Sequence, residues 1–195
     1  MSADLTEEIA ATAARLIVDE GMDWGAAKQR AARDLGAPRA ALPGNDQVED
    51  AVREHIAIFH ADTQPAELRA LRDVAAQWME RLADFRPHLT GAVWRGTATK
   101  LSNVHLQLYC NDGKEAEIAL LDRGVNFDVA ETQGPRGRPV DMLVLDAPCP
   151  ALGERVTVCL TILDFDDLRG ALKPDARGQT DRGDLAALRQ LLDRA

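Results

Sequence analysis

The first half of the chain has the hydrophobic spacing of amphipathic helices. Apolar residues recur every three or four positions in four successive segments, at about 5–20, 24–35, 45–59 and 63–86. Glycine and proline separate these segments, and Asn45 and Thr63 are expected to cap the third and fourth helices. The pattern therefore predicts that the chain is helical up to Pro87.

The pattern changes after Pro87, where apolar and polar residues begin to alternate and β-branched residues become frequent. Such alternation is typical of strands, because successive side chains of a strand point to opposite faces. It predicts strands at 89–95, 103–110, 125–131, 139–146 and 155–163. Helices are expected again at 114–122 and 185–192. Helices followed by strands indicate an α+β fold with a mixed or antiparallel sheet flanked by helices.

These patterns also indicate how the chain is divided. We expect an all-helical N-terminal region at 1–62 and an α+β domain at 63–195, which begins with the long fourth helix. An alternative places that helix in a bundle with the first three. A helix-turn-helix interpretation of 22–36 is disfavoured because this segment lacks the basic face that DNA docking requires.

Composition narrows the classes of partner. The chain has 195 residues, 46% of them hydrophobic, and a formal net charge of −9. This charge argues against nucleic acid bound through a basic surface, although a small phosphorylated ligand needs only a local positive site. The sequence contains no apolar run long enough for a membrane span and no signal-peptide pattern at its start. With three widely spaced cysteines, it fits a reduced, cytoplasmic protein.

The histidines give no indication of a zinc site. His55, His60, His88 and His105 form no HxxxH or HExxH pair, and the cysteines form no CxxC pair. His55 and His60 are five positions apart, so we expect them on different sides of a helix. A closed zinc site needs four clustered ligands, which this spacing does not predict.

The most specific pattern lies between Leu89 and Leu106, in the stretch LTGAVWRGTATKLSNVHL. It resembles the nucleotidyltransferase superfamily, in particular the minimal nucleotidyltransferases related to DNA polymerase beta. That family has a glycine-serine turn, an Arg-Gly-Thr-Ala stretch, and a strand on which two aspartates alternate with hydrophobic residues. The resemblance implies the fold of that family for the α+β domain. It also implies transfer of a nucleoside monophosphate from a triphosphate to a hydroxyl, with magnesium or manganese.

Residue by residue, the resemblance implies two sets of site residues. The nucleotide or phosphate would be bound by Gly91, Arg95, Gly96 and Ser102. The metal would be bound, weakly, by the residues at the family's carboxylate positions, which are Asn103, His105 and Asp141. Of these, Asp141 would be the catalytic residue, because it is the only carboxylate at a matching position.

The departures from the family pattern decide the expected activity. Ala92 replaces the family's serine, and Asn103 and His105 replace its two aspartates. Histidine is a poor ligand for magnesium, which prefers oxygen. We therefore expect a nucleotide- or phosphate-binding or regulatory module with lost or much reduced transfer. The alternative is an active magnesium-dependent nucleotidyltransferase acting on a small molecule or a protein. A protein partner or a homodimer stays open.

One other acidic pair has two interpretations. Asp164 and Asp166 follow the last expected strand, and they would share a face like a metal-binding pair if the strand continued. Alternatively, they leave the strand and cap the turn that follows. The pattern favours the cap.

Overall fold

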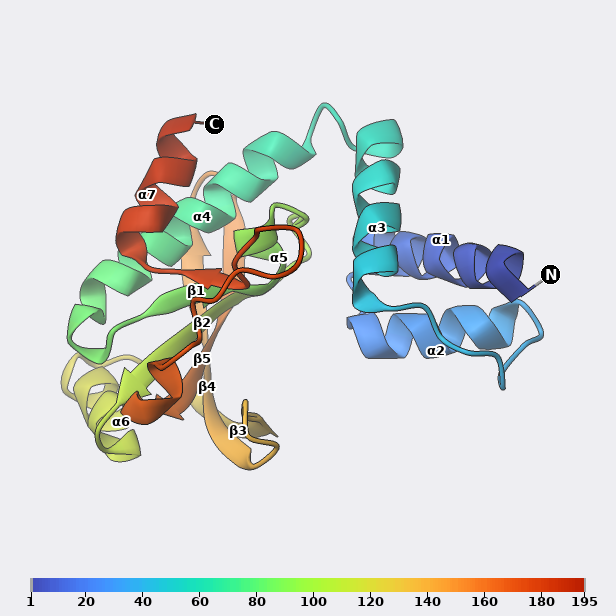
Figure 1. Cartoon of the computed structure of the whole chain (residues 1–195). Helices are drawn as coiled ribbons and strands as arrows, with labels where there is room; N and C mark the ends of the chain where they lie inside the picture. Colours follow the sequence, from blue (N-terminus) through green and yellow to red (C-terminus); the bar gives the residue numbers. More distant parts are fainter. Residues whose placement is uncertain (1, 195) are drawn as a thin grey trace. The chain divides into compact units, whose positions relative to one another are not determined.

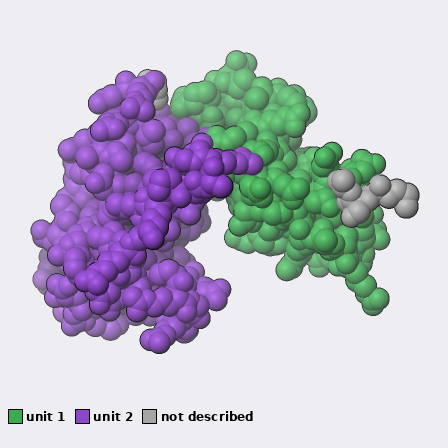
Figure 2. All heavy atoms as spheres, viewed as in Figure 1, with its two compact units in different colours: residues 1–66, 97–102 green, residues 67–96, 103–195 purple. Residues whose placement is uncertain are grey.

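The computed structural model describes residues 2–194, which fall into two compact units (Figure 2). The first unit runs to Ala66 and includes Thr97–Ser102. The second unit comprises Glu67–Gly96 and the chain from Asn103 onward. The division therefore falls slightly later than residue 62, and a short segment of the expected α+β domain is assigned to the helical unit.

The first unit is built around α1 (Ser2–Glu20), which packs against both α2 (Trp24–Asp34) and α3 (Asn45–Phe59). This is because α1 has two apolar stripes on adjacent faces. Its residues Ile9, Ala13 and Leu16 are buried against α2, and Ala10, Ala14 and Val18 are buried against α3. The expected helices are confirmed. The third is capped by Gly44, however, and Asn45 is its first residue.

The second unit is a six-stranded mixed sheet with helices, so the expected α+β class is confirmed (Figure 1). The sheet order is β3-β4-β5-β2-β1-β6, and of its neighbouring strands β2 and β5 run parallel. In chain order the elements are α4 (Gln64–Arg81), η1 (Ala83–Phe85), β1 (His88–Thr90), α5 (Gly91–Arg95), β2 (Val104–Cys110), α6 (Gly113–Asp122), β3 (Asp128–Gln133), β4 (Pro139–Cys149), β5 (Glu154–Asp164), η2 (Phe165–Leu168), β6 (Arg182–Gly183) and α7 (Leu185–Arg194).

Two sequence-based expectations are resolved by this arrangement. From Glu67 onward, α4 belongs to the unit of the sheet, with Leu71, Ala75 and Met79 fully buried, rather than to an N-terminal bundle. The expected strand at 89–95 is wrong, because β1 ends at Thr90 and the next five residues form α5. Gly91 has a φ of 71°, which breaks the strand at that point.

The two faces of the sheet have different characters. Leu89, Leu106, Leu160 and Leu143 lie in register across four strands and are fully buried. On the opposite face, Thr90, His105, Cys159 and Val144 lie in register, and all of them except Cys159 are only partly buried. The partly exposed face is therefore the one that carries His105.

Helices of the second unit cover the leucine face. Gly113 at the start of α6 lies beside Ile162, and α4 meets α6 at a pocket of about 390 Å³ lined by Trp78, Leu82 and Leu120 among others. An ion pair between Glu80, near the end of α4, and Arg189, in the middle of α7, joins these two helices. Between residues 2 and 194, no helix has the length and apolar character needed to cross a membrane.

The close contact between β6 and α5 gives a test of this packing. A methyl group added at Gly183 would overlap the indole ring of Trp94, so we expect Gly183→Ala to lower the free energy of unfolding by about 1–3 kcal/mol. Gly113→Ala is the matched control, because its new methyl would meet Ile162 at an ordinary 3.5 Å. Urea unfolding measures both. Equal stabilities of the two variants would contradict the packing described.

Candidate functional site

The turn between β1 and β2 contains two of the glycines expected to bind phosphate. Gly91 and Gly96 lie at the two ends of α5 with φ values of 71° and 82°, a region that favours glycine. A Cβ at Gly91 would lie only 3.7 Å from the Cδ2 atom of His105. Gly91 therefore lies beside the ring of His105 on the neighbouring strand β2, at an ordinary van der Waals distance for an added Cβ.

A buried arginine holds this turn in place. Arg72 of α4, which is 9% exposed, donates from Nε to the carbonyl of Val93 at 3.0 Å and from a terminal nitrogen to the carbonyl of Trp94 at 3.2 Å. Burial lowers the pKa of its guanidinium, which nevertheless stays charged. A cation is favourable here because these carbonyls lie at the C-terminal end of a helix.

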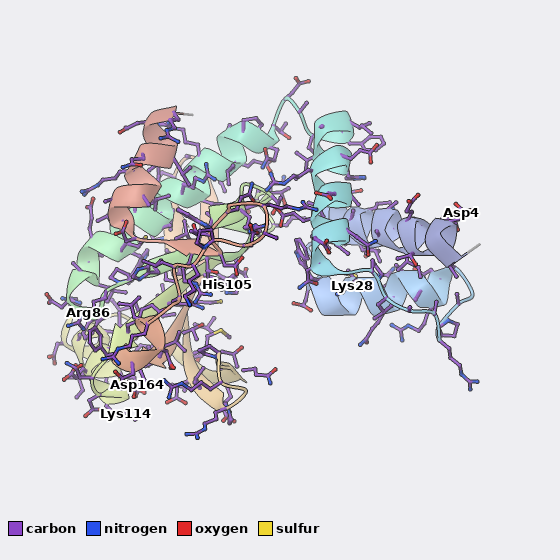
Figure 3. All side chains as sticks on the ribbon, in the orientation of Figure 1. Asp4, Lys28, Arg86, His105, Lys114 and Asp164 are labelled. Atoms are coloured by element: carbon purple, nitrogen blue, oxygen red, sulfur yellow. The ribbon has the colours of Figure 1, made fainter. Side chains whose placement is uncertain are left out.

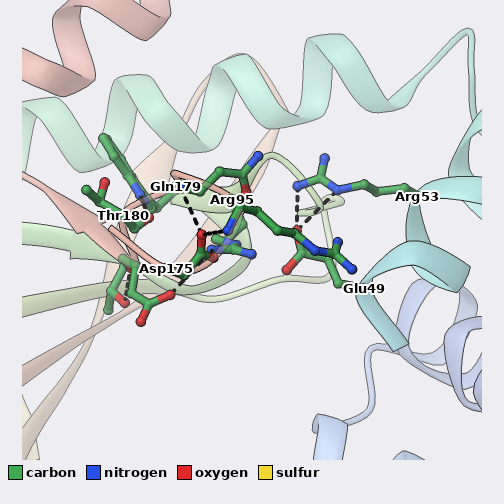
Figure 4. A network of polar contacts seen from close by, with 10 residues as sticks. Glu49, Arg53, Arg95, Asp175, Gln179 and Thr180 are labelled. Atoms are coloured by element: carbon green, nitrogen blue, oxygen red, sulfur yellow. Dashed lines mark hydrogen bonds and ion pairs between the residues drawn. The ribbon is translucent and has the colours of Figure 1, made fainter. Parts of the chain in front are cut away.

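Arg95, at the end of α5, is held by carboxylates from the loop before β6. Its guanidinium contacts Asp175 at 3.5 Å and Asp181 at 3.3 Å (Figure 4). A hydrogen bond from the amide of Gln179 is the main cause that lowers the pKa of Asp175, and Arg95 adds to it. The carboxyl of Asp175 is therefore an anion at neutral pH, and a phosphate would have to compete with Asp175 and Asp181 for Arg95.

The same loop is anchored over α5. The indole of Trp94 donates to the carbonyl of Thr180 at 2.7 Å, and the hydroxyl of Thr90 donates to the carbonyl of Asp181 at 2.9 Å. These bonds keep the carboxylates of the loop near Arg95.

Ser102 and Asn103 have separate roles. Ser102 belongs to the first unit, where its hydroxyl accepts a hydrogen bond from the amide of Thr99 at 3.0 Å and stabilises a turn. Asn103 directly precedes β2, and it alternates with Val104 so that it shares the face of His105. Of the expected phosphate-binding residues, the second unit thus contains Gly91, Arg95 and Gly96.

The structure does not bring Asp141 to His105. Met142 of β4 pairs with Thr161, which in turn pairs with Gln107, so Met142 shares the face of His105 and the adjacent Asp141 points to the opposite face. There Asp141 lies 3.9 Å from Lys114 at the start of α6, and Lys114 is well separated from His105 in Figure 3. Asp141 is kept apart from His105 because strand β5 lies between β2 and β4 in the sheet.

Strand β5, which pairs with β2, supplies no carboxylate on the face of His105 in place of Asp141. Cys159 pairs with His105, and Thr161 pairs with Gln107. Burial raises the pKa of the Cys159 thiol, so this group is neutral. An amide, an imidazole, a neutral thiol and a hydroxyl do not fit a magnesium or manganese pair, which requires several anionic oxygens.

Asp164 acts as a helix cap. It is the last residue of β5, and its side chain accepts a hydrogen bond from the amide of Asp166 at 2.9 Å. Asp166 already belongs to η2, so the two carboxylates do not extend one strand face.

Sequence reasoning missed a cluster of three side chains in the first unit. Nε2 of His60 lies 2.9 Å from Oδ1 of Asp19, and Nε2 of His55 lies 3.1 Å from the same oxygen. Desolvation opposes ionisation of Asp19, but hydrogen bonds with His60 and His55 outweigh it and lower the pKa of the carboxyl.

The expectation that His55 and His60 lie on different sides of a helix is therefore wrong. Helix α3 ends at Phe59, and His60 follows it with a φ of −130° and a ψ of 17°. The chain turns at this residue, and its ring comes within 5.8 Å of the His55 ring. Helical spacing did not apply because one of the two histidines lies outside the helix.

Comparisons with known proteins add no assignment. No protein-family model matches the chain, and no curated protein and no solved structure matches it. Functional inference for this chain rests on its own residues and their geometry.

The role of Arg72 gives a second test. Arg72→Met leaves two carbonyls of α5 without their charged donor, so we expect the free energy of unfolding to fall by about 2–4 kcal/mol. Arg69→Met is the matched control on the same helix, since Arg69 makes an exposed hydrogen bond to the carbonyl of Leu192. It should cost less than about 1 kcal/mol. Chemical unfolding compares the two, and an equal loss in both would exclude a special role for Arg72.

Proposed function

We propose that the second unit is a nucleotidyltransferase-like module that binds a nucleotide or another phosphorylated ligand at the β1–α5–β2 turn, with lost or much reduced nucleotidyl transfer. The observation that carries this proposal is that Gly91 lies beside His105, because a Cβ added at Gly91 would be 3.7 Å from the Cδ2 atom of the His105 ring. It supports the proposal because the glycine turn and the aspartate strand of the family form one site.

Binding would use the backbone and one arginine. Gly91 has no side chain, so a ligand could approach the backbone amides of the turn that begins α5. Arg95 at the other end of α5 supplies a guanidinium, which pairs well with phosphate oxygens.

The loop carboxylates fit the same proposal. Asp175 and Asp181 contact the Arg95 guanidinium at 3.5 Å and 3.3 Å, at the position that a phosphate oxygen would take in this proposal. In our proposal a phosphate replaces one or both carboxylates, so that the loop before β6 responds to the ligand.

Nucleotidyl transfer, unlike binding of a phosphate, depends on carboxylates that hold metal ions. Asn103 and His105 carry no negative charge at the family positions, and Asp141 points to the other face of the sheet. The proposal therefore separates binding of the phosphate, which the turn supports, from transfer, for which the carboxylates are missing.

Thermal unfolding with ATP, CTP, GTP or UTP, with and without magnesium or manganese, tests binding. A ligand at about one hundred times its Kd should stabilise the protein by about 2.7 kcal/mol. Arg95→Met should weaken this effect, and Asp175→Asn combined with Asp181→Asn should strengthen it by removing the competing carboxylates. Arg194→Met, at the exposed end of α7, is the matched control and should leave it unchanged.

Absence of stabilisation by every nucleotide would contradict the proposed binding. Metal-dependent release of pyrophosphate would contradict the loss of transfer and favour the active enzyme.

A second pair of variants tests whether the lack of carboxylates at positions 103 and 105 explains the expected loss of metal binding. Asn103→Asp combined with His105→Asp restores two carboxylates on one face of the strand. We expect manganese to increase the stabilisation by nucleotide in this variant, because two carboxylates can hold a divalent ion. Asn103→Ser combined with His105→Ser removes the same side chains without adding charge. A manganese effect of equal size in both variants would show that these positions do not face the ligand.

A further inference from the structure

The second candidate site lies wholly in the first unit and does not depend on nucleotide binding. We propose that Asp19, His55 and His60 bind a divalent transition-metal ion of the zinc class, with one carboxylate oxygen and the Nε2 atoms of both imidazoles as ligands.

The separations between the donor atoms suit a metal ion. Oδ1 of Asp19 lies 3.1 Å from Nε2 of His55 and 2.9 Å from Nε2 of His60, and the three ligand atoms lie within 4.8 Å of one another. Zinc bonds to nitrogen and oxygen are about 2.0–2.2 Å long, so neighbouring ligand atoms around the ion are about 3–3.5 Å apart. Small rotations of the side chains would therefore admit an ion between them.

The donor chemistry selects the class of metal. Neutral imidazole suits zinc, cobalt, nickel and iron, whereas magnesium and calcium prefer oxygen ligands. The carboxylate of Asp19 supplies the one negative charge. Two imidazoles and one carboxylate leave positions for water or another ligand, as in open rather than closed zinc sites.

The backbone that carries these ligands is well supported. Val18, next to Asp19 in α1, is buried in one cluster with Val52 and Ile56 of α3. At the end of α3 the amide of His60 donates to the carbonyl of Ile56 at 2.8 Å. The ring of His55 lies 4.7 Å from the ring of Phe59. Donors that are already positioned by packing lose less entropy when an ion binds.

An ion at this place would join two ends of helices. Asp19 lies near the end of α1, and His60 is the residue at which α3 ends. The carbonyl of His60 also accepts hydrogen bonds from the amides of Thr63 and Gln64 at the start of the next helix. The ion would therefore fix the segment that follows α3 to the end of α1.

Calorimetric titration of the untagged 195-residue chain with zinc tests the proposal, and the visible absorption of added cobalt provides a second readout. We expect one ion for each chain. His55→Gln, His60→Gln and Asp19→Asn should each weaken binding at least about tenfold, because each removes a direct ligand. His88→Gln is the matched histidine control from outside the cluster, and it should bind zinc like the wild type.

If a variant fails to fold, the chemical shifts of the histidine rings in the wild-type protein provide a second test that needs no substitution. Zinc should shift the resonances of His55 and His60 and leave those of His88 and His105 in place, and excess magnesium should not reverse this. The proposal is overturned if zinc does not bind saturably, if the His55 and His60 variants keep full affinity, or if only other histidines respond. The experiment contains no nucleotide, so its outcome is independent of the function proposed for the second unit.

Discussion

The second unit depends on one buried cation. Arg72 reaches from α4 to the carbonyls of Val93 and Trp94, and a buried guanidinium is stable only where hydrogen-bond acceptors meet it. This interaction fixes the short helix α5 directly after β1. The turn at Gly91 then comes to lie against His105, and Trp94 is placed to receive the loop before β6. One polar contact between α4 and α5 thus positions the main features of the candidate phosphate site.

The register of the sheet sets the limit on its chemistry. Strand β5 lies between β2 and β4, so the residues beside His105 are Cys159 and Thr161 rather than an acid. Asp141 points to the other face, where it meets Lys114. A phosphate needs only amides and a cation, but a metal pair needs anionic oxygens on one face. The arrangement therefore fits binding better than transfer.

The sequence predicted most elements because their side chains follow a regular period. The helices of the first unit, β2, β4 and β5 were recovered to within a few residues at their ends. Residues 91–95 were assigned to a strand because their apolar content resembles one, whereas the structure has a helix there, with a positive φ at Gly91 and the Val93 carbonyl bound by Arg72. The distances between strands that decide the place of Asp141 are likewise absent from local patterns. The cluster of Asp19, His55 and His60 was missed because helical spacing was applied to His60, which lies beyond the expected and observed end of α3 at residue 59, and because no local pattern places Asp19 of α1 beside it.

The central claim is that the second unit binds a nucleotide without transferring it. Phosphorus NMR of a nucleoside triphosphate measures binding and transfer in one sample. The spectra are followed over time with the protein and magnesium, without manganese. The account predicts that the phosphate resonances of the nucleotide broaden or shift on addition of protein, and that no pyrophosphate signal grows. Unchanged resonances would contradict the binding, and a growing pyrophosphate signal that requires the protein would contradict the loss of transfer.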